Sequence, residues 1–165
     1  MQKIIEMEFH FRKASGKDVN NVFKLSNEEQ VRHNSINKEK INYLDHVEWF
    51  SRVINANDYR LYIVEDDIEF AGQVKFQIID GTASISISIH QAFRGAGNGK
   101  TIISESINFL RLDIPDINEI VAYIDPKNTA SIKSFLSAEF KSMGTQKFGL
   151  HEYNKYIYQI HERQV

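Results

Sequence analysis

The sequence has 165 residues, of which 42% are hydrophobic, and this size and composition suit one folded domain with a sizeable core. Its net charge of −2 argues against a nucleic-acid partner, and the lack of cysteine excludes disulfides, thiolate zinc sites and cysteine nucleophiles. Residues 1–13 contain no apolar run long enough for a signal peptide or a membrane span. We therefore expect a single domain over residues 1–165, cytoplasmic and without a membrane partner.

The first half of the chain alternates between short strands and helices. Ser15 and Asp18 have the spacing of a capping box and predict a helix that begins just after them. A second helix is indicated by an apolar stripe at Tyr43, Val47, Phe50 and Ile54. The expected order is a strand (7–14), a helix (19–27), a polar loop (28–40), the second helix, and strands over 60–65 and 71–79.

The second half begins with a hairpin signal, Asp80-Gly81. Residues 83–90 alternate strictly, with isoleucines on one face and serines and His90 on the other, which predicts a strand with two unlike faces. After a glycine-rich loop we expect a helix ending before Pro115, a strand (117–124), a helix (129–140) and a final hairpin (140–161). Because a strand–helix–strand unit requires a crossover, the sheet should combine parallel and antiparallel pairs.

In the glycine-rich loop, residues 93–101, the spacing of the glycines distinguishes between three phosphate-binding motifs. A Walker loop requires glycine where Arg94 stands, and a dinucleotide fingerprint requires glycine at Lys100 or Ile102. The pattern R-x-x-G-x-G fits in full, at Arg94, Gly97 and Gly99. The alternative is a glycine-rich surface turn that binds no ligand.

R-x-x-G-x-G resembles the pyrophosphate loop of the GNAT superfamily of N-acetyltransferases. The segment 128–140 resembles that family's second conserved segment, N-x-x-S-x-x-x-Y-x-x-x-G-F, through Asn128, Ser131 and Phe140. Two positions depart from it. Glu139 stands where the family usually has glycine, and Phe135 replaces a tyrosine commonly proposed to protonate the departing thiolate.

The resemblance covers nearly the whole chain and implies an α/β fold of the α+β kind, the GNAT fold, with a single mixed central sheet of about seven strands flanked by about four helices. It implies acetyl-CoA as the cofactor, with its pyrophosphate at the start of the helix after the loop and its acetyl arm in a splay of the sheet. Asn128 could equally be a helix N-cap. The implied cofactor-binding residues are Ile87, Ile89, Arg94, Gly95, Ala96, Gly97, Asn98, Gly99, Lys100, Asn128, Ser131 and Phe135.

The acceptor is expected to bind to the first 80 residues. The patterns R-x-N-S, H-x-x-W-F and G-Q-V-[RK]-F resemble GNAT domains of bacterial nucleotide-sugar pathways to pseudaminic or legionaminic acid, which N-acetylate 4-amino sugars carried on UDP. In that resemblance Arg32 binds phosphate, Trp49 stacks on a ring and His46 is the candidate catalytic base. The implied substrate-binding residues are Arg32, Asn34, His46, Trp49, Gln73 and Lys75, where Lys75 replaces the more usual arginine.

Several alternatives stay open at this point. Trp49 and His46 could instead pack in or beside the core, and Gln73 and Lys75 share a strand face that looks either into a cleft or into solvent. The acceptor could be a protein N-terminus, a polyamine or another small amine, and the domain could bind acetyl-CoA without catalysis. We expect a small-molecule amine as the partner and no metal, because the six histidines lack paired ligand spacing. The oligomeric state is open, with a homodimer among the alternatives.

Overall fold

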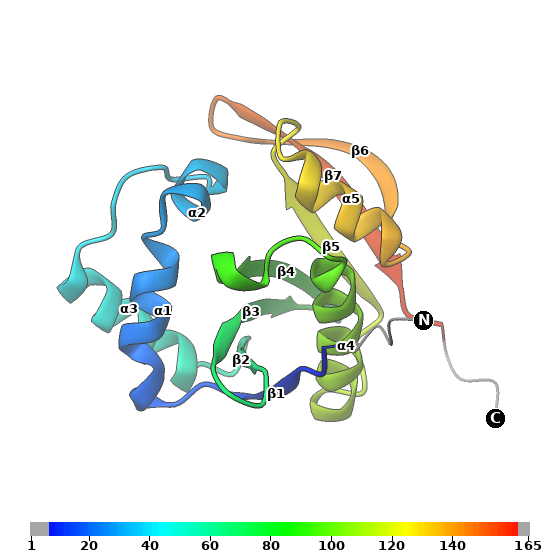
Figure 1. Cartoon of the computed structure of the whole chain (residues 1–165). Coiled ribbons are helices and arrows are strands. Elements are labelled where there is room, and N and C mark those ends of the chain that lie inside the picture. The colour runs from blue at the N-terminus through cyan, green and yellow to red at the C-terminus, as the bar shows by residue number, and fades with distance from the viewer. Residues whose placement is uncertain (1–6, 162–165) are drawn as a thin grey trace, which may run out of the picture.

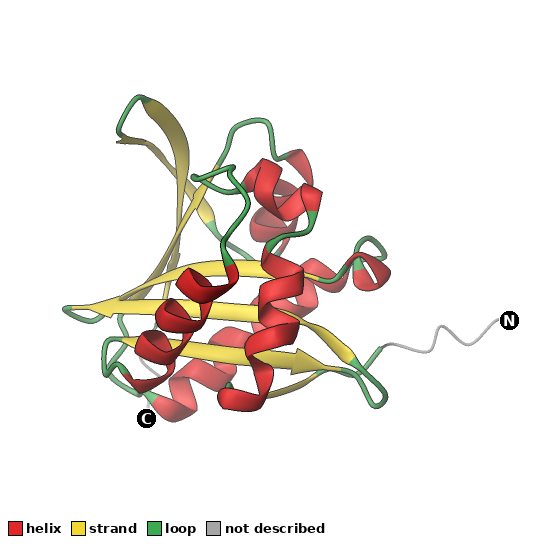
Figure 2. Cartoon of the chain, turned by 90° about the vertical axis from the view of Figure 1, so that its left-hand side faces the viewer, coloured by secondary structure: helices red, strands yellow, loops and turns green. Residues whose placement is uncertain are grey.

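The computed structural model describes residues 7–161, so the first six residues of the segment judged for a signal peptide lie outside it. These residues form a seven-stranded sheet in the order β1-β2-β3-β4-β5-β7-β6, with α1 and α3 on one side and α4 on the other (Figure 1). Only β4 and β5 pair in parallel. The predicted mixed sheet is therefore confirmed, and Figure 2 shows the helices layered against it.

The elements lie close to their expected positions. The strands are β1 (His10–Lys13), β2 (Tyr59–Glu65), β3 (Phe70–Ile79), β4 (Thr82–Ile89), β5 (Glu119–Ile124), β6 (Lys141–Phe148) and β7 (His151–Gln159). The helices are α1 (Val19–Ser26), α2 (Glu29–Asn34), α3 (Tyr43–Asn55), α4 (Asn98–Asp113) and α5 (Thr129–Ser137), with 3₁₀ turns at Gly16–Asp18 and Gln91–Phe93.

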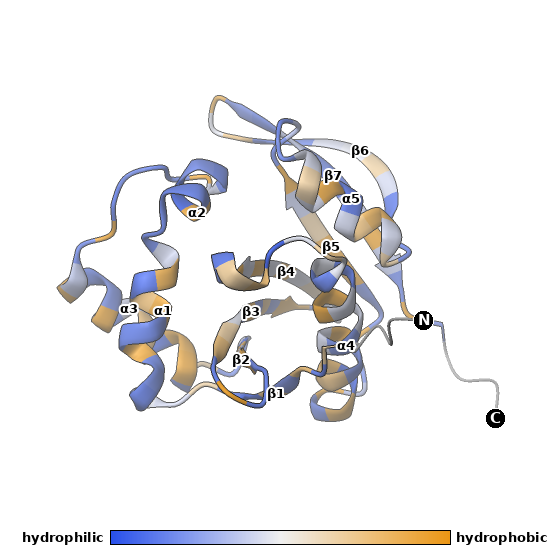
Figure 3. Cartoon of the chain, viewed as in Figure 1, coloured by the Kyte–Doolittle hydropathy of each residue, from blue (hydrophilic) through white to orange (hydrophobic). Residues whose placement is uncertain are grey.

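Helix α2 lies inside the segment that the sequence predicts to be a polar loop. It has no buried residue and is mostly hydrophilic in Figure 3, so it carries no apolar stripe to reveal it. Helix α3 is where it was expected, but its stripe is rotated. It buries His46, Phe50 and Val53, whereas Tyr43 and Val47 stay 43% and 36% exposed.

The hairpin between β3 and β4 turns at Asp80 and Gly81, which have φ angles of 50° and 78°. Two successive positive φ angles are typical of a type I′ turn, which fixes the register of the two strands. That register places Ile85 in the core beneath α4 and leaves Ser86, on the other face, exposed. The two-faced strand predicted from the alternation is confirmed.

The end of α5 accounts for one of the two residues that depart from the N-x-x-S-x-x-x-Y-x-x-x-G-F pattern. The helix stops at Ser137, three residues before the predicted end, and Glu139 has a φ of 71°. This left-handed conformation is the one that glycine adopts without strain, so the position has a backbone geometry that suits the glycine of the pattern although its residue is glutamate.

Replacing Glu139 by glycine is expected to raise the free energy of unfolding by about 0.5–1 kcal/mol, because relief of the left-handed strain exceeds the added entropy of the unfolded chain. Thermal unfolding should show a melting temperature higher by roughly 1–4 °C. The matched control is Lys133→Gly, at an exposed position inside α5, which should destabilise by about 1 kcal/mol. A lower melting temperature for Glu139→Gly would contradict this reading of the turn.

Candidate functional site

The sheet opens between its two parallel strands. Thr82, Ala83 and Ser84 of β4 pair with Glu119, Ile120 and Val121 of β5, and the pairing stops there. The rest of β4, up to Ile89, pairs only with β3 among the described residues. The edge of Ile85–Ile89 that faces β5 therefore has backbone groups without a strand partner, and an extended ligand with amide groups could occupy this edge as an added strand.

The glycine-rich loop connects this open edge to the start of α4. Gly95, Ala96 and Gly97 all have positive φ angles, of 84°, 52° and 78°. A Cβ atom built on Gly95 or Gly97 would meet no other atom within 4 Å, so both face open space. The first amide groups of a helix lack intrahelical partners and its dipole favours an anion there. This geometry fits a pyrophosphate at the N-terminus of α4.

Gly99 has a different role from Gly97. A Cβ atom at Gly99 would lie 2.6 Å from the Ser134 hydroxyl oxygen, so this glycine allows α4 and α5 to approach each other closely. A substitution there would disturb the helix contact as well as any ligand. Asn98 and Gly99 are half-buried, whereas Lys100 is exposed in the first turn of α4.

The second conserved segment supports the site by packing. Asn128 caps α5, because its side-chain oxygen accepts a hydrogen bond from the Ser131 amide at 3.2 Å. Phe135 is 2% exposed and its ring packs edge-on against Phe140, with 4.9 Å between the ring centroids. The N-cap interpretation of Asn128 is thus present in the structure, and Phe135 is a core residue without any group that could donate a proton.

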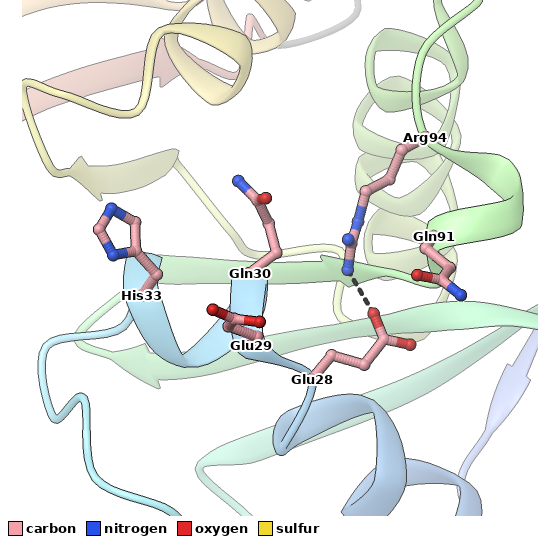
Figure 4. Close-up of a pocket in the computed structure, with 6 residues that line it drawn as sticks. All are labelled: Glu28, Glu29, Gln30, His33, Gln91 and Arg94. Atoms are coloured by element: carbon pink, nitrogen blue, oxygen red, sulfur yellow. Dashed lines mark hydrogen bonds and ion pairs between the residues drawn. The ribbon is translucent and has the colours of Figure 1, made fainter.

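A pocket of about 420 Å³ opens at the end of β4. Figure 4 shows the Arg94 side chain pointing to Glu28. The Arg94 Nη2 donates to a Glu28 carboxylate oxygen at 2.6 Å, and its Nε donates to the Ile89 carbonyl at 2.9 Å. The lining residues are Glu28, Glu29, Gln30, His33, Gln91 and Arg94.

None of the six residues expected to bind the acceptor lines this pocket. Arg32 lies on α2 and its guanidinium bonds the carbonyl oxygens of Ser26 (2.6 Å) and Asn37 (2.8 Å) and the Ser35 hydroxyl (3.0 Å). It thereby fixes the connection between α2 and α3 and has little capacity left for a phosphate. Asn34 ends the same helix and is half-buried.

His46 is 1% exposed and belongs to the packing between α1 and α3. Its Nε2 lies 3.0 Å from the Val19 carbonyl, and its ring contacts those of Phe23 and Phe50. A catalytic base must reach the acceptor amine, and a side chain enclosed in this way does not. The position of His46 therefore favours the core alternative over the expectation that it is the base.

Trp49 and Lys75 do not line the pocket either, and Trp49 packs beside His46. Trp49 packs against the cluster between β2, α1 and α3, and the Lys75 ammonium lies 5.4 Å from the Trp49 ring centroid and 6.0 Å from that of Tyr59. Burial lowers the pKa of Lys75. These contacts suit a cation–π interaction within the protein better than a contact to substrate.

Gln73 is the acceptor candidate nearest to the end of β4. It lies opposite Ser88 on β4, is 9% exposed, and donates through Nε2 to the Ser26 hydroxyl at 3.4 Å. Its Oε1 has no hydrogen-bond partner among the described residues. Gln73 therefore stays a candidate for holding substrate.

Sequence patterns missed Glu28, the residue that faces Arg94 across the pocket. The only available signal was its place in the acidic pair Glu28-Glu29 directly after a predicted helix, and such a pair is common on protein surfaces. Within residues 7–161, no group of three or more His, Asp or Glu side chains is arranged to hold a metal ion, and no helix has the length and apolar composition needed to cross a membrane.

Comparison with known protein families finds a match over most of the chain. Residues 8–141 match the family model described as an acetyltransferase (GNAT) domain. None of the curated proteins compared with the chain matches it.

Solved structures share the fold at low sequence identity. The spermidine N-acetyltransferase from Vibrio cholerae in complex with CoA and spermine superposes with a TM-score of 0.81 and 17% identity, over 92% of this chain and 95% of that one. The aminoglycoside acetyltransferase AAC(6')-Ib, in complex with ribostamycin and coenzyme A, gives 0.82 and 16%, over 92% and 93%. The ribosomal-protein-alanine N-acetyltransferase from Brucella melitensis gives 0.74 and 20%, over 92% and 99%.

Proposed function

Because the chain belongs to the acetyltransferase (GNAT) domain family and is thus an acetyl-CoA-dependent N-acetyltransferase, we propose that its acceptor is a small primary amine that enters through the pocket lined by Glu28 and Arg94. One observation carries this proposal. The unpaired edge of β4 ends at the loop that begins α4, and the pocket opens at that same end. A thioester lying along the edge and an amine in the pocket would therefore meet.

The residues around the cofactor suit its individual parts. The pantetheine arm would lie along Ile85–Ile89, where the backbone groups have no strand partner and only the Ile89 carbonyl is bonded by Arg94. The pyrophosphate would lie at the N-terminus of α4, where Gly97 leaves open space. Acetyl-CoA would supply a thioester. A deprotonated acceptor amine would form the new C–N bond to its carbonyl carbon as the C–S bond breaks, the thiolate would leave, and the proton lost by the amine would pass to solvent or to the thiolate. Phe135 offers no proton to that thiolate, and a thiol of pKa about 8.5 needs little assistance to leave.

The charge of the pocket favours a positively charged acceptor. Glu28 and Glu29 both line it, and an ammonium group is attracted by carboxylates. The bound spermine and ribostamycin named for two of the structural neighbours are small molecules with amino groups, which supports the same class.

A UDP-linked 4-amino sugar, favoured by the sequence pattern, remains one member of this class. Its amino group would suit the pocket, but its two phosphates would need cations other than Arg32, whose guanidinium is bonded to Ser26 at the end of α1 and to Asn37 after α2. The nucleotide sugar is therefore one of several acceptors to be tested.

The test is an acceptor panel at saturating acetyl-CoA, with acetylated products identified by mass spectrometry. The panel contains polyamines, aminoglycosides, UDP-4-amino-4,6-dideoxy sugars and peptides with free N-termini. We expect turnover of at least one small amine. Turnover of peptides alone would contradict the small-molecule proposal, and CoA binding with no turnover of any amine would indicate a non-catalytic acetyl-CoA-binding module.

A further inference from the structure

Arg94 connects two parts of the site that serve different substrates. Its Nε bonds the Ile89 carbonyl, at the end of the open edge of β4. Its Nη2 bonds Glu28, which lies in the connection between α1 and α2 (Figure 4). The same guanidinium thus holds a backbone group on the cofactor side and a carboxylate on the acceptor side.

The ion pair between Arg94 and Glu28 can be replaced by a contact of Arg94 to another anion. The side chains of Arg94 and Glu28 are 31% and 23% exposed, and ion pairs near the surface contribute little to stability. Arg94 also lies in the glycine-rich loop, directly before Gly95, and the loop faces open space at Gly95 and Gly97. A pyrophosphate bound there would compete with Glu28 for the guanidinium, since arginine binds phosphate and carboxylate oxygens with the same donors.

We infer that Glu28 is the residue that selects an ammonium-bearing acceptor, and that Arg94 masks it until acetyl-CoA binds. This inference rests on the proposed function of the pocket. When Arg94 turns to the pyrophosphate, the remaining ion-pair partner of Glu28 in the described chain is His90, at 3.7 Å, which is cationic only if protonated. The carboxylate is then free for the ammonium group of the acceptor.

Masking has a thermodynamic consequence that a purely structural ion pair lacks. If cofactor binding breaks the Arg94–Glu28 contact, removing the Glu28 charge beforehand makes cofactor binding easier. By linkage, the cofactor and the acceptor must also increase each other's affinity by the same factor. A structural ion pair that merely orders the loop would instead weaken CoA binding when broken.

The first test titrates CoA into the wild type, Glu28→Gln and Glu29→Gln by calorimetry. Glu29→Gln is the matched control, because Glu29 lines the same pocket and makes no ion pair among the described residues. We expect Glu28→Gln to bind CoA roughly two- to fivefold more tightly than the wild type, the scale of an exposed ion pair, and Glu29→Gln to change affinity by less.

The second test measures binding of spermidine, as a polycationic probe, with and without CoA. The wild type should bind it roughly two- to fivefold more tightly with CoA present, the same scale as the ion pair that both ligands must break, and Arg94→Gln should remove that difference. With CoA present, Glu28→Gln should bind spermidine more weakly than the wild type, and equal or tighter binding would overturn the selecting role of Glu28.

Equal CoA affinities of Glu28→Gln and Glu29→Gln would overturn the masking role of Arg94. The CoA titration needs no acceptor, so its result is separate from the acceptor panel, whose failure would refute the proposed function.

Discussion

Replacing Gly97 by valine is expected to abolish measurable CoA binding, a loss of more than about 100-fold. Gly97 has a φ of 78° and faces open space at the start of α4, so a β-branched side chain would strain the loop and fill the place proposed for the pyrophosphate. Calorimetry with CoA measures the effect. The milder variant Gly97→Asn, which tolerates the left-handed conformation, should still lose roughly tenfold because its side chain occupies the same space.

The matched control for strain alone is Gly149→Val. Gly149 lies in the turn between β6 and β7 with a φ of 62°, and it too has no atom within 4 Å of a built Cβ. This variant should lose a comparable amount of stability, about 1–2 kcal/mol, and keep its CoA affinity. Unchanged affinity in a folded Gly97→Val protein would reject the pyrophosphate site.

Replacing His46 by alanine is expected to reduce the free energy of unfolding by about 2–4 kcal/mol, because it opens a cavity between α1 and α3 and removes the hydrogen bond to the Val19 carbonyl. The kcat of the folded fraction, measured well below the melting temperature, should stay within roughly twofold. Glu48→Ala, at an exposed position on the same helix, should change stability by less than about 0.5 kcal/mol. A kcat loss of about 10²-fold or more at unchanged fold would restore His46 as the base.

The same residue gives a pH dependence of stability with a defined sign. Burial lowers the pKa of His46 below its ordinary value of 6.5. As the pH falls below 6.5, the unfolded chain takes up a proton that folded His46 does not, so the unfolded state gains stability. Between pH 7.5 and 5.5 the wild type should therefore lose more stability than His46→Gln. Equal losses, measured by chemical denaturation, would contradict this account of the buried ring.

Local patterns determined much of the fold because they act within a few residues. The alternation over residues 83–90 fixed which face of β4 enters the core, and Asp80-Gly81 fixed the turn before it. The spacing of Arg94, Gly97 and Gly99 likewise predicted the loop whose positive φ angles now lead into α4. These signals depend on backbone conformation and side-chain direction, which neighbouring residues largely set.

Only the tertiary structure determined which residues line the acceptor pocket, because these residues are distant in sequence and meet only through packing. Arg32 and His46 are polar residues whose types suit catalysis and binding, yet the fold uses one to bond its own loop and encloses the other beneath α1. Glu28 lies 66 residues from Arg94 in the sequence, and no pattern relates the two. The packing of the helices on the sheet determines which polar side chains face a pocket. This packing depends on the whole apolar core and not on any short stretch of sequence.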